Sequence, residues 1–223
     1  MIAVIFDLDG TLIDSLPNVR DAANAVLHAF DQPPLDARTV AGFVGLGEQV
    51  FVDRLIAATD LEPSSRADIL SKFIAEYKRV ALETRPFPGV VEVLQAFQNR
   101  GVPMGVVTNK PRAPLVPTLE AADLSRYFAS VVAGDDLPLR KPDPAPLRHA
   151  MAELGVDRCV YIGDTPIDAE TAARAGMPFG LFTEGIRTVP LEDISCDFSF
   201  SRFGDLPNML REGGYGFDAA TLS

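Results

Sequence analysis

Acidic side chains follow the first apolar segment of the chain, where Asp7 and Asp9 stand two positions apart and Gly10 and Thr11 come next. Residues 2–6 are apolar and partly β-branched, which is typical of a buried strand, so the two carboxylates belong at or just beyond its carboxyl end. Carboxylates a few Å apart repel each other. The spacing therefore indicates a bound cation, a shared proton or chemistry on a phosphate ester.

Two later loops carry groups that favour an anion. Thr108 and Asn109 follow another apolar segment, and Pro111 predicts a helix N-terminus beside them, where free backbone N–H groups attract negative charge. Lys141 stands in the loop before a further predicted helix at 144–154 and offers a point charge for phosphate. Both loops are therefore candidate phosphate sites.

A second acidic pair lies in the stretch VYIGDTPID. A strand is expected to end at Gly163, with Asp164 next and Pro166 starting a helix. Asp168 lies one helical turn beyond Asp164, which places both carboxylates on the same side. This pair resembles the opening one in its position after a strand.

Strand-like and helix-like segments alternate through most of the chain, which predicts a doubly wound, Rossmann-like parallel sheet covered on both faces. In such sheets ligands bind beyond the carboxyl ends of the strands. Each polar loop alone is more often a turn or a helix cap, but four at one sheet edge indicate a shared site. The expected strands are 2–6, 103–107, 130–133, 159–162 and 179–182, and the expected helices are 90–98, 113–122, 144–154 and 166–175.

The long segment between the first two strands shows helical periodicity and no convincing strand. Helices are expected at 19–30, 48–59 and 65–82. We therefore predict a small inserted helical domain, the cap, at 15–84, and an α/β core made of 1–14 and 85–223. The prolines and glycine of TRPFPG mark the second junction.

Composition limits the possible functions. The 223 residues carry a net charge of −11 with an isoelectric point near 4.6, which disfavours nucleic acid and anionic membranes as partners. The sequence shows neither a signal peptide nor a membrane span. Cys159 and Cys196 match no metal or redox spacing and are expected to be reduced packing residues, which favours a cytoplasmic location. We expect a monomer or a homodimer.

The motifs as a set resemble those of the haloacid dehalogenase superfamily of phosphotransferases. The resemblance extends from residue 2 to about residue 182, and the helical insertion resembles the family's small cap. The matching positions are Asp7, Asp9 and Thr11 for the first motif, Thr108 with Asn109 for the second, Lys141 for the third, and Gly163, Asp164 and Asp168 for the fourth.

The resemblance implies a mechanism for the opening pair. Asp7 would be the nucleophile that forms an aspartyl-phosphate. Asp9 would be the acid that protonates the leaving alcohol and then the base that activates water. Asp9 also favours phosphate transfer over dehalogenation, because a halide leaving group needs no general acid. Thr108, Asn109 and Lys141 would hold the phosphoryl oxygens.

The resemblance also implies a Mg²⁺ cofactor. The ion would bind Asp7, the backbone carbonyl of Asp9, and Asp164, with water completing an octahedron of oxygen ligands. Asp168 would support the site from outside the ligand set. The expected partner is a small anionic phosphate ester. Among such esters we expect 2-phosphoglycolate as the substrate, because the stretch GFVGLGEQVFVDRL and the core motifs most resemble the phosphoglycolate phosphatase branch.

Other functions remain open at this stage. A sugar phosphomutase of the β-phosphoglucomutase kind shares the core, and a pyrophosphatase would use the same chemistry. A non-catalytic phosphoacceptor, or receiver-like protein, also combines acids, a hydroxyl and Lys-Pro, but such domains are short and lack a cap. Gly45 and Gly47 are equally compatible with a substrate loop of the cap and with a plain turn between helices.

Overall fold

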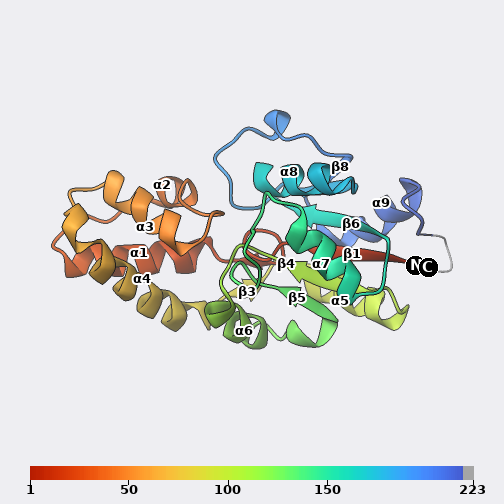
Figure 1. Ribbon diagram of the computed structural model, residues 1–223, viewed down its shortest axis with the longest axis horizontal. Helices are drawn as coiled ribbons and strands as arrows, with labels where there is room; N and C mark the ends of the chain where they lie inside the picture. Colours follow the sequence, from red (N-terminus) through yellow and green to blue (C-terminus); the bar gives the residue numbers. More distant parts are fainter. Residues whose placement is uncertain (218–223) are drawn as a thin grey trace.

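The computed structural model describes residues 1–217 and contains a six-stranded sheet whose paired strands all run parallel (Figure 1). The strand order is β5-β4-β1-β6-β7-β8, with β1 inside the sheet. The predicted doubly wound fold is therefore confirmed. The strands are β1 (Ile2–Phe6), β4 (Met104–Val107), β5 (Ser130–Val132), β6 (Arg158–Gly163), β7 (Phe179–Phe182) and β8 (Phe198–Phe200).

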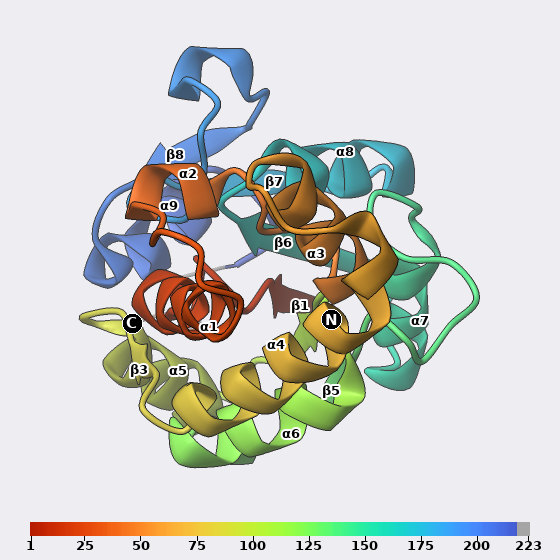
Figure 2. The same cartoon turned by 90° about the vertical axis from the view of Figure 1, so that its left-hand side faces the viewer.

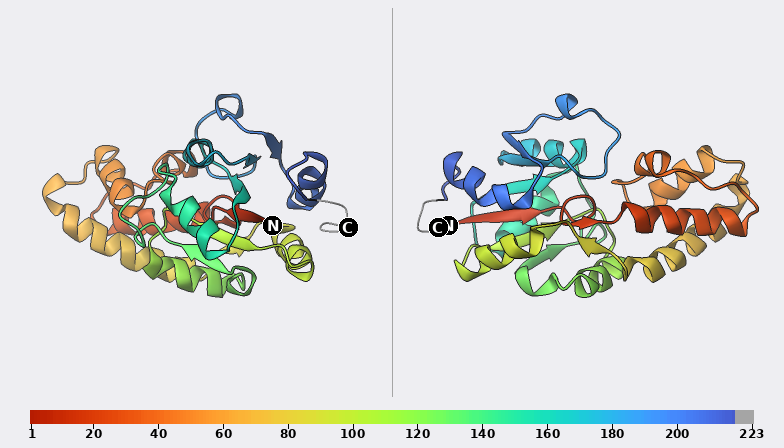
Figure 3. Two further views of the ribbon diagram at one scale, coloured as in Figure 1. Left: turned by 45° about the vertical axis from the view of Figure 1, so that its right-hand side comes forward. Right: turned by 180° about the vertical axis from the view of Figure 1, so that it is seen from behind.

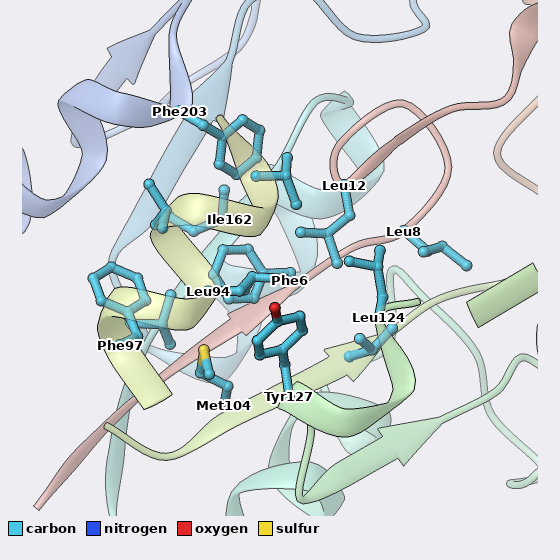
Figure 4. Close-up of a cluster of buried hydrophobic side chains, with 14 of the residues drawn as sticks. Phe6, Leu8, Leu12, Leu94, Phe97, Met104, Leu124, Tyr127, Ile162 and Phe203 are labelled. Atoms are coloured by element: carbon cyan, nitrogen blue, oxygen red, sulfur yellow. The ribbon is translucent and has the colours of Figure 1, made fainter. Parts of the chain in front are cut away.

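Helices cover both faces of the sheet because successive side chains of each buried strand point to opposite sides. In β1, Val4 and Phe6 pack into one apolar cluster, and Ala3 and Ile5 pack into the other. Figure 4 shows part of the first cluster around Phe6. That cluster contains side chains of α5 (Val90–Asn99), α6 (Arg112–Ala121) and α9 (Leu206–Glu212), and the other contains side chains of α7 (Ala145–Glu153) and α8 (Pro166–Ala175).

Four further helices, all within the predicted cap segment 15–84, lie together at one end of the molecule (Figures 1 and 3). Figure 2 looks along the long axis and shows them in front of β1. They pack around an apolar cluster of their own, which includes Leu27, Phe51 and Phe73. The helices are α1 (Leu16–Ala29), α2 (Ala37–Ala41), α3 (Glu48–Ala57) and α4 (Arg66–Ala81).

The two chain crossings between cap and core lie side by side. Ile13 pairs with Pro86, and Asp14 with Arg85, in a short antiparallel ladder of β2 (Ile13–Asp14) and β3 (Arg85–Pro86). The expectation that no strand lies between the first two strands of the sheet was wrong here. Each of these strands has only two residues, too few for a periodic signal in the sequence.

Other differences from the sequence prediction are small and local. The structure adds α2, α9 and β8, all short. Pro111 and Pro144 each precede their helix by one residue instead of occupying its first turn. Short 3₁₀ turns occur at Pro63–Ser65, Ser125–Tyr127, Leu191–Asp193 and Phe203–Asp205.

Two remaining expectations concern membranes and thiols. Among residues 1–217, no helix has the length and apolar character needed to cross a membrane. Cys159 and Cys196 are both free thiols. Cys159 is buried, as expected, but Cys196 is exposed, so its expected packing role was wrong.

We expect Phe97→Ala to lower the free energy of unfolding by about 3–5 kcal/mol, because Phe97 is fully buried against the sheet and its removal leaves a cavity. Urea unfolding measures this value. Val116→Ala, at an exposed position of α6, is the control and should change stability by less than about 0.5 kcal/mol. Equal effects of the two substitutions would contradict this packing of the core.

Candidate active site

The polar loops predicted from the sequence meet at one edge of the sheet. Asp7, Asp9, Thr108, Asn109 and Lys141 all line one pocket of about 350 Å³ between core and cap. The fourth motif lies directly beside this pocket. Carboxylate oxygens of its Asp164 and Asp168 and of Asp7 all lie within 4.8 Å of one another. The sequence therefore correctly predicted that these side chains converge.

Lys141 is the cation at the centre of this cluster. Its Nζ lies 2.9 Å from Asp7 Oδ1 and 2.7 Å from Asp168 Oδ1. It also donates a hydrogen bond of 3.0 Å to the hydroxyl of Tyr161, which in turn donates to the backbone carbonyl of Val107. The side chain of Lys141 is only 3% exposed. Because water is excluded, this charge acts strongly on the carboxylates around it.

Asp168 has its hydrogen-bonding capacity filled by the protein. Its Oδ1 accepts from Lys141 and lies 3.1 Å from the hydroxyl of Tyr161, and its Oδ2 accepts from the side chain and backbone of Thr165 and from the backbone of Asp164. The bonds with Thr165 also cap α8. Gly163 is needed here, since a Cβ at that position would lie 2.4 Å from Asp168 Cβ. Asp168 therefore orients its neighbours rather than standing free to bind a ligand.

Asp164 is held in place by donors on both oxygens. Its Oδ1 accepts a hydrogen bond of 2.6 Å from Thr11, and its Oδ2 accepts one of 2.7 Å from the backbone N–H of Ile186. Glycines allow this close packing, because a Cβ at Gly10 or Gly185 would lie 2.3 Å from an atom of the Asp164 side chain. Gly10 also has a φ of +85°, which a residue with a Cβ rarely adopts.

The geometry fits a divalent cation. Asp7 Oδ1 is buried, and its partner is the ion-paired Nζ of Lys141 at 2.9 Å. An oxygen of Asp164 lies within 4.8 Å of it. Hard oxygen ligands of this kind suit Mg²⁺, and the ion would add a second positive partner to the one that Lys141 gives Asp7. Because Asp168 is already saturated, Asp7 and Asp164 are the side chains that could bind the ion.

Burial and crowding shift the pKa values of the cluster. Burial raises the pKa of Asp7 from 3.8 to about 7, and the attraction of Lys141 only partly offsets it. Burial, followed by repulsion from Asp168 and Asp7, holds the pKa of Asp164 well above its usual range. For Lys141, burial lowers the pKa, but the adjacent carboxylates outweigh it and the net shift is upward. The site therefore holds more negative charge than Lys141 alone can compensate.

The second motif, Thr108 and Asn109, forms hydrogen bonds with other segments that line the pocket. Asn109 accepts from the backbone N–H of Lys141 and donates to the carbonyls of Lys141 and of Gly45 in the cap, at 3.0–3.1 Å. Thr108 is buried, and its hydroxyl accepts from the backbone N–H of Lys110. Gly45 and Gly47 both have positive φ and line the pocket. The side chain of Asn109 thus joins core to cap.

The Asp9 side chain contacts two residues that sequence reasoning did not single out. Lys110 Nζ lies 3.1 and 3.2 Å from the two carboxylate oxygens, and the hydroxyl of Tyr77 in α4 donates to Asp9 at 3.3 Å. Lys110 also donates to the Tyr77 hydroxyl. The only sequence signal was the position of Lys110 directly after Thr108-Asn109, and nothing in the sequence indicated which side of α4 faces the core.

Three arginines of the cap and of the loop after β7 make contacts away from the pocket. Arg20 pairs with the adjacent Asp21, Arg54 donates to the carbonyl of Gly42, and Arg187 donates to a backbone carbonyl. None of the three lines the pocket.

Comparison with known proteins identifies the family. A family model described as haloacid dehalogenase-like hydrolase matches residues 1–176. The phosphoglycolate phosphatase of Cereibacter sphaeroides is 37% identical over 214 residues, covering 95% of this chain and 98% of that protein. The crystal structure of a predicted phosphoglycolate phosphatase from Haemophilus somnus superposes with a TM-score of 0.88 at 28% identity, covering 94% of this chain and 97% of that one.

A further solved structure bears on the mutase alternative. The structure of a putative β-phosphoglucomutase from Thermotoga maritima superposes with a TM-score of 0.77 at 26% identity, and covers 95% of this chain and 99% of that one. The fold alone therefore does not separate the two activities.

The chain belongs to the haloacid dehalogenase-like hydrolases. Within that family it is an enzyme of the phosphatase class, similar to phosphoglycolate phosphatases along nearly its whole length.

The raised pKa of Asp7 predicts that the metal-free protein loses stability as pH rises from about 4 to about 7. In this window the folded state keeps a proton on Asp7 that the unfolded chain has released, so the free energy of unfolding falls with rising pH. Asp7→Asn removes this effect. With a chelator present, we expect the variant to have a higher Tm than the wild type at about pH 8 and an equal Tm at about pH 4.

Thermal unfolding at several pH values measures this difference. Asp60→Asn, at an exposed position of the cap, is the matched control and should follow the wild type throughout. A Tm of Asp7→Asn that lies below the wild-type value at both ends of the pH range would contradict the cause assigned to the shift.

Proposed function

We propose that this phosphatase hydrolyses 2-phosphoglycolate through an aspartyl-phosphate intermediate, with Mg²⁺ as its cofactor. One observation carries the proposal. Asp7 lies in the pocket with a buried oxygen that is ion-paired with Lys141 and lies within 4.8 Å of an oxygen of Asp164. A carboxylate with a free lone pair next to cationic groups suits attack on the phosphorus of a dianionic ester.

The two carboxylates of the first motif would divide the reaction. A carboxylate oxygen of Asp7 forms a bond to phosphorus while the bond from phosphorus to the ester oxygen breaks. Asp9 gives its proton to that oxygen, which leaves as the alcohol of glycolate. Asp9 then takes a proton from a water molecule that attacks the aspartyl-phosphate, which releases inorganic phosphate and restores Asp7.

Asp7, the backbone carbonyl of Asp9, and Asp164 would hold Mg²⁺. The bound ion would neutralise charge on the phosphoryl oxygens and on the surrounding carboxylates. Thr11 and Ile186 keep the Asp164 carboxylate oriented toward the cluster. This support matters because a hydrogen-bonded ligand loses less freedom when an ion binds.

Thr108, Asn109 and Lys141 would hold the phosphoryl group. Lys141 supplies the charge, and the fixed loop after β4 supplies the hydroxyl and backbone N–H groups. Asn109 contributes mainly by fixing the backbone of Lys141. A protein with a net charge of −11 needs such a local set of donors to bind a dianion.

The proposed domain division gives the cap the role of choosing the substrate. Residues 15–84 would form the cap, and 1–14 with 85–223 the catalytic core. Gly45 and Gly47 lie where the cap reaches the pocket, which supports a substrate loop at this place. The choice of 2-phosphoglycolate rests on the similarity to proteins of that name.

Purified wild-type protein with Mg²⁺ is expected to release phosphate from 2-phosphoglycolate faster than from other small phosphate esters. Asp7→Asn should lower kcat by at least ~10³-fold, because the covalent step is lost. Chelation of the metal should have a comparable effect. A phosphate-release assay over a panel of esters measures the substrate preference, the effect of Asp7→Asn and the effect of chelation, with Asp60→Asn as the control.

Two outcomes would overturn the proposal. Failure of the active wild-type enzyme to prefer 2-phosphoglycolate would remove the substrate assignment. Conversion of a hexose phosphate into its isomer, without net phosphate release, would instead identify a mutase.

A further inference from the structure

Lys110 forms a buried ion pair that the proposed chemistry does not use. Its side chain is 2% exposed, and its Nζ contacts both oxygens of Asp9. The same Nζ lies 4.2 Å from the ring centre of Tyr77 and donates to its hydroxyl. Lys110 of the core and Tyr77 of the cap thus both contact the carboxylate of Asp9.

Three lysines line the pocket, of which Lys110 and Lys141 are buried and Lys78 is exposed. Lys141 is engaged by Asp7 and Asp168. Lys110 is the other buried lysine of the lining. The arrangement therefore offers one cation for the phosphoryl group and a second for another anionic group.

The direction of the proposed reaction places that second group near Lys110. In phosphoryl transfer the attacking and leaving oxygens lie roughly in line, on opposite sides of phosphorus. Asp7 would attack from one side, so the leaving oxygen faces Asp9, which must protonate it. In 2-phosphoglycolate the carboxylate carbon is separated from this oxygen by a single methylene group. The substrate carboxylate therefore enters the space next to Asp9, where Lys110 and Tyr77 lie.

Apolar side chains enclose this part of the pocket. The rings of Phe73 and Tyr77 stack with centroids 5.8 Å apart, and Phe51 stacks on Phe73 at 4.4 Å. All three line the pocket. Because these rings displace water, an ion pair formed here is stronger than one at the surface.

We propose that Lys110, positioned by Tyr77, binds the carboxylate of the substrate. This ion pair replaces the one between Lys110 and Asp9. In the absence of substrate the Asp9 carboxylate occupies this place. On binding, the substrate carboxylate pairs with Lys110, and Asp9 turns to the leaving oxygen. Lys110 thus selects phosphate esters that carry a carboxylate one methylene away from the ester oxygen. The inference rests on the proposed function, because it uses the roles assigned there to Asp7 and Asp9.

Binding to an inactive enzyme tests the inference apart from catalysis. In an Asp7→Asn background with Mg²⁺, calorimetry compares 2-phosphoglycolate with 2-hydroxyethyl phosphate, which has a neutral CH₂OH in place of the carboxylate. We expect 2-phosphoglycolate to bind roughly 10- to 100-fold more tightly, the effect of one charge-assisted hydrogen bond. Adding Lys110→Met should remove most of this preference and leave the affinity for 2-hydroxyethyl phosphate within about threefold.

Kinetics of the otherwise wild-type enzyme provide the second measurement. Lys110→Met should lower kcat/KM for 2-phosphoglycolate by roughly 10- to 100-fold, mostly through KM, and should change kcat/KM for 2-hydroxyethyl phosphate far less. Lys110→Arg keeps the charge and should retain part of the preference. Lys72→Met, an exposed position on α4 outside the pocket lining, is the control for losing a lysine.

Tyr77→Phe keeps the inference testable if Lys110→Met fails to fold. It removes only the hydroxyl that contacts Lys110, and it should weaken the preference for the carboxylate in the same direction by a smaller factor. Equal losses on both esters in these variants would overturn the inference, because Lys110 would then only position Asp9. The absence of any phosphate release or ester binding by the unmodified site would instead count against the proposed function.

Discussion

Three buried carboxylates around a single lysine form the constraint on which the rest of this structure depends. Asp7, Asp164 and Asp168 place oxygens within 4.8 Å of one another, and Lys141 is the cation in contact with two of them. Burying charge in this way is costly unless a partner compensates it. The upward pKa shifts of Asp7 and Asp164 express that cost.

Much of the surrounding sequence serves to make this cluster possible. The glycines next to Asp164 and Asp168 leave room that a Cβ would fill, and Thr11 and Thr165 supply hydroxyls to the carboxylates. Tyr161 connects Lys141 to the backbone of β4. The parallel sheet brings these residues together because its strands all end at the same edge.

The sheet and the polar residues at its carboxyl edge could be predicted because both leave strong local signals. Continuous apolar runs such as Phe179–Phe182 indicate strands buried on both faces. Polar residues directly after such runs then share one edge of the sheet by topology alone. Tyr161 was predicted only as part of a strand, since an apolar pattern does not show that its hydroxyl bonds Lys141.

The interface between cap and core could not be predicted from the sequence in the same way. Tyr77 lies on an amphipathic helix, and its contact with Asp9 depends on how the whole cap is placed on the core. Lys110 followed a predicted motif but resembled an ordinary lysine before a proline. Strand β8 was missed because three residues, Phe198–Phe200, between polar neighbours give too short a pattern.

The most direct test of the central claim is a crystal structure with Mn²⁺ as a substitute for Mg²⁺, located by its anomalous scattering. We expect one ion bound by carboxylate oxygens of Asp7 and Asp164, with Asp168 still hydrogen-bonded to Lys141. An ion bound to Asp168 in place of Asp7, or no ion at this edge of the sheet at saturating Mn²⁺, would contradict the claim that the acidic cluster exists to hold a divalent cation.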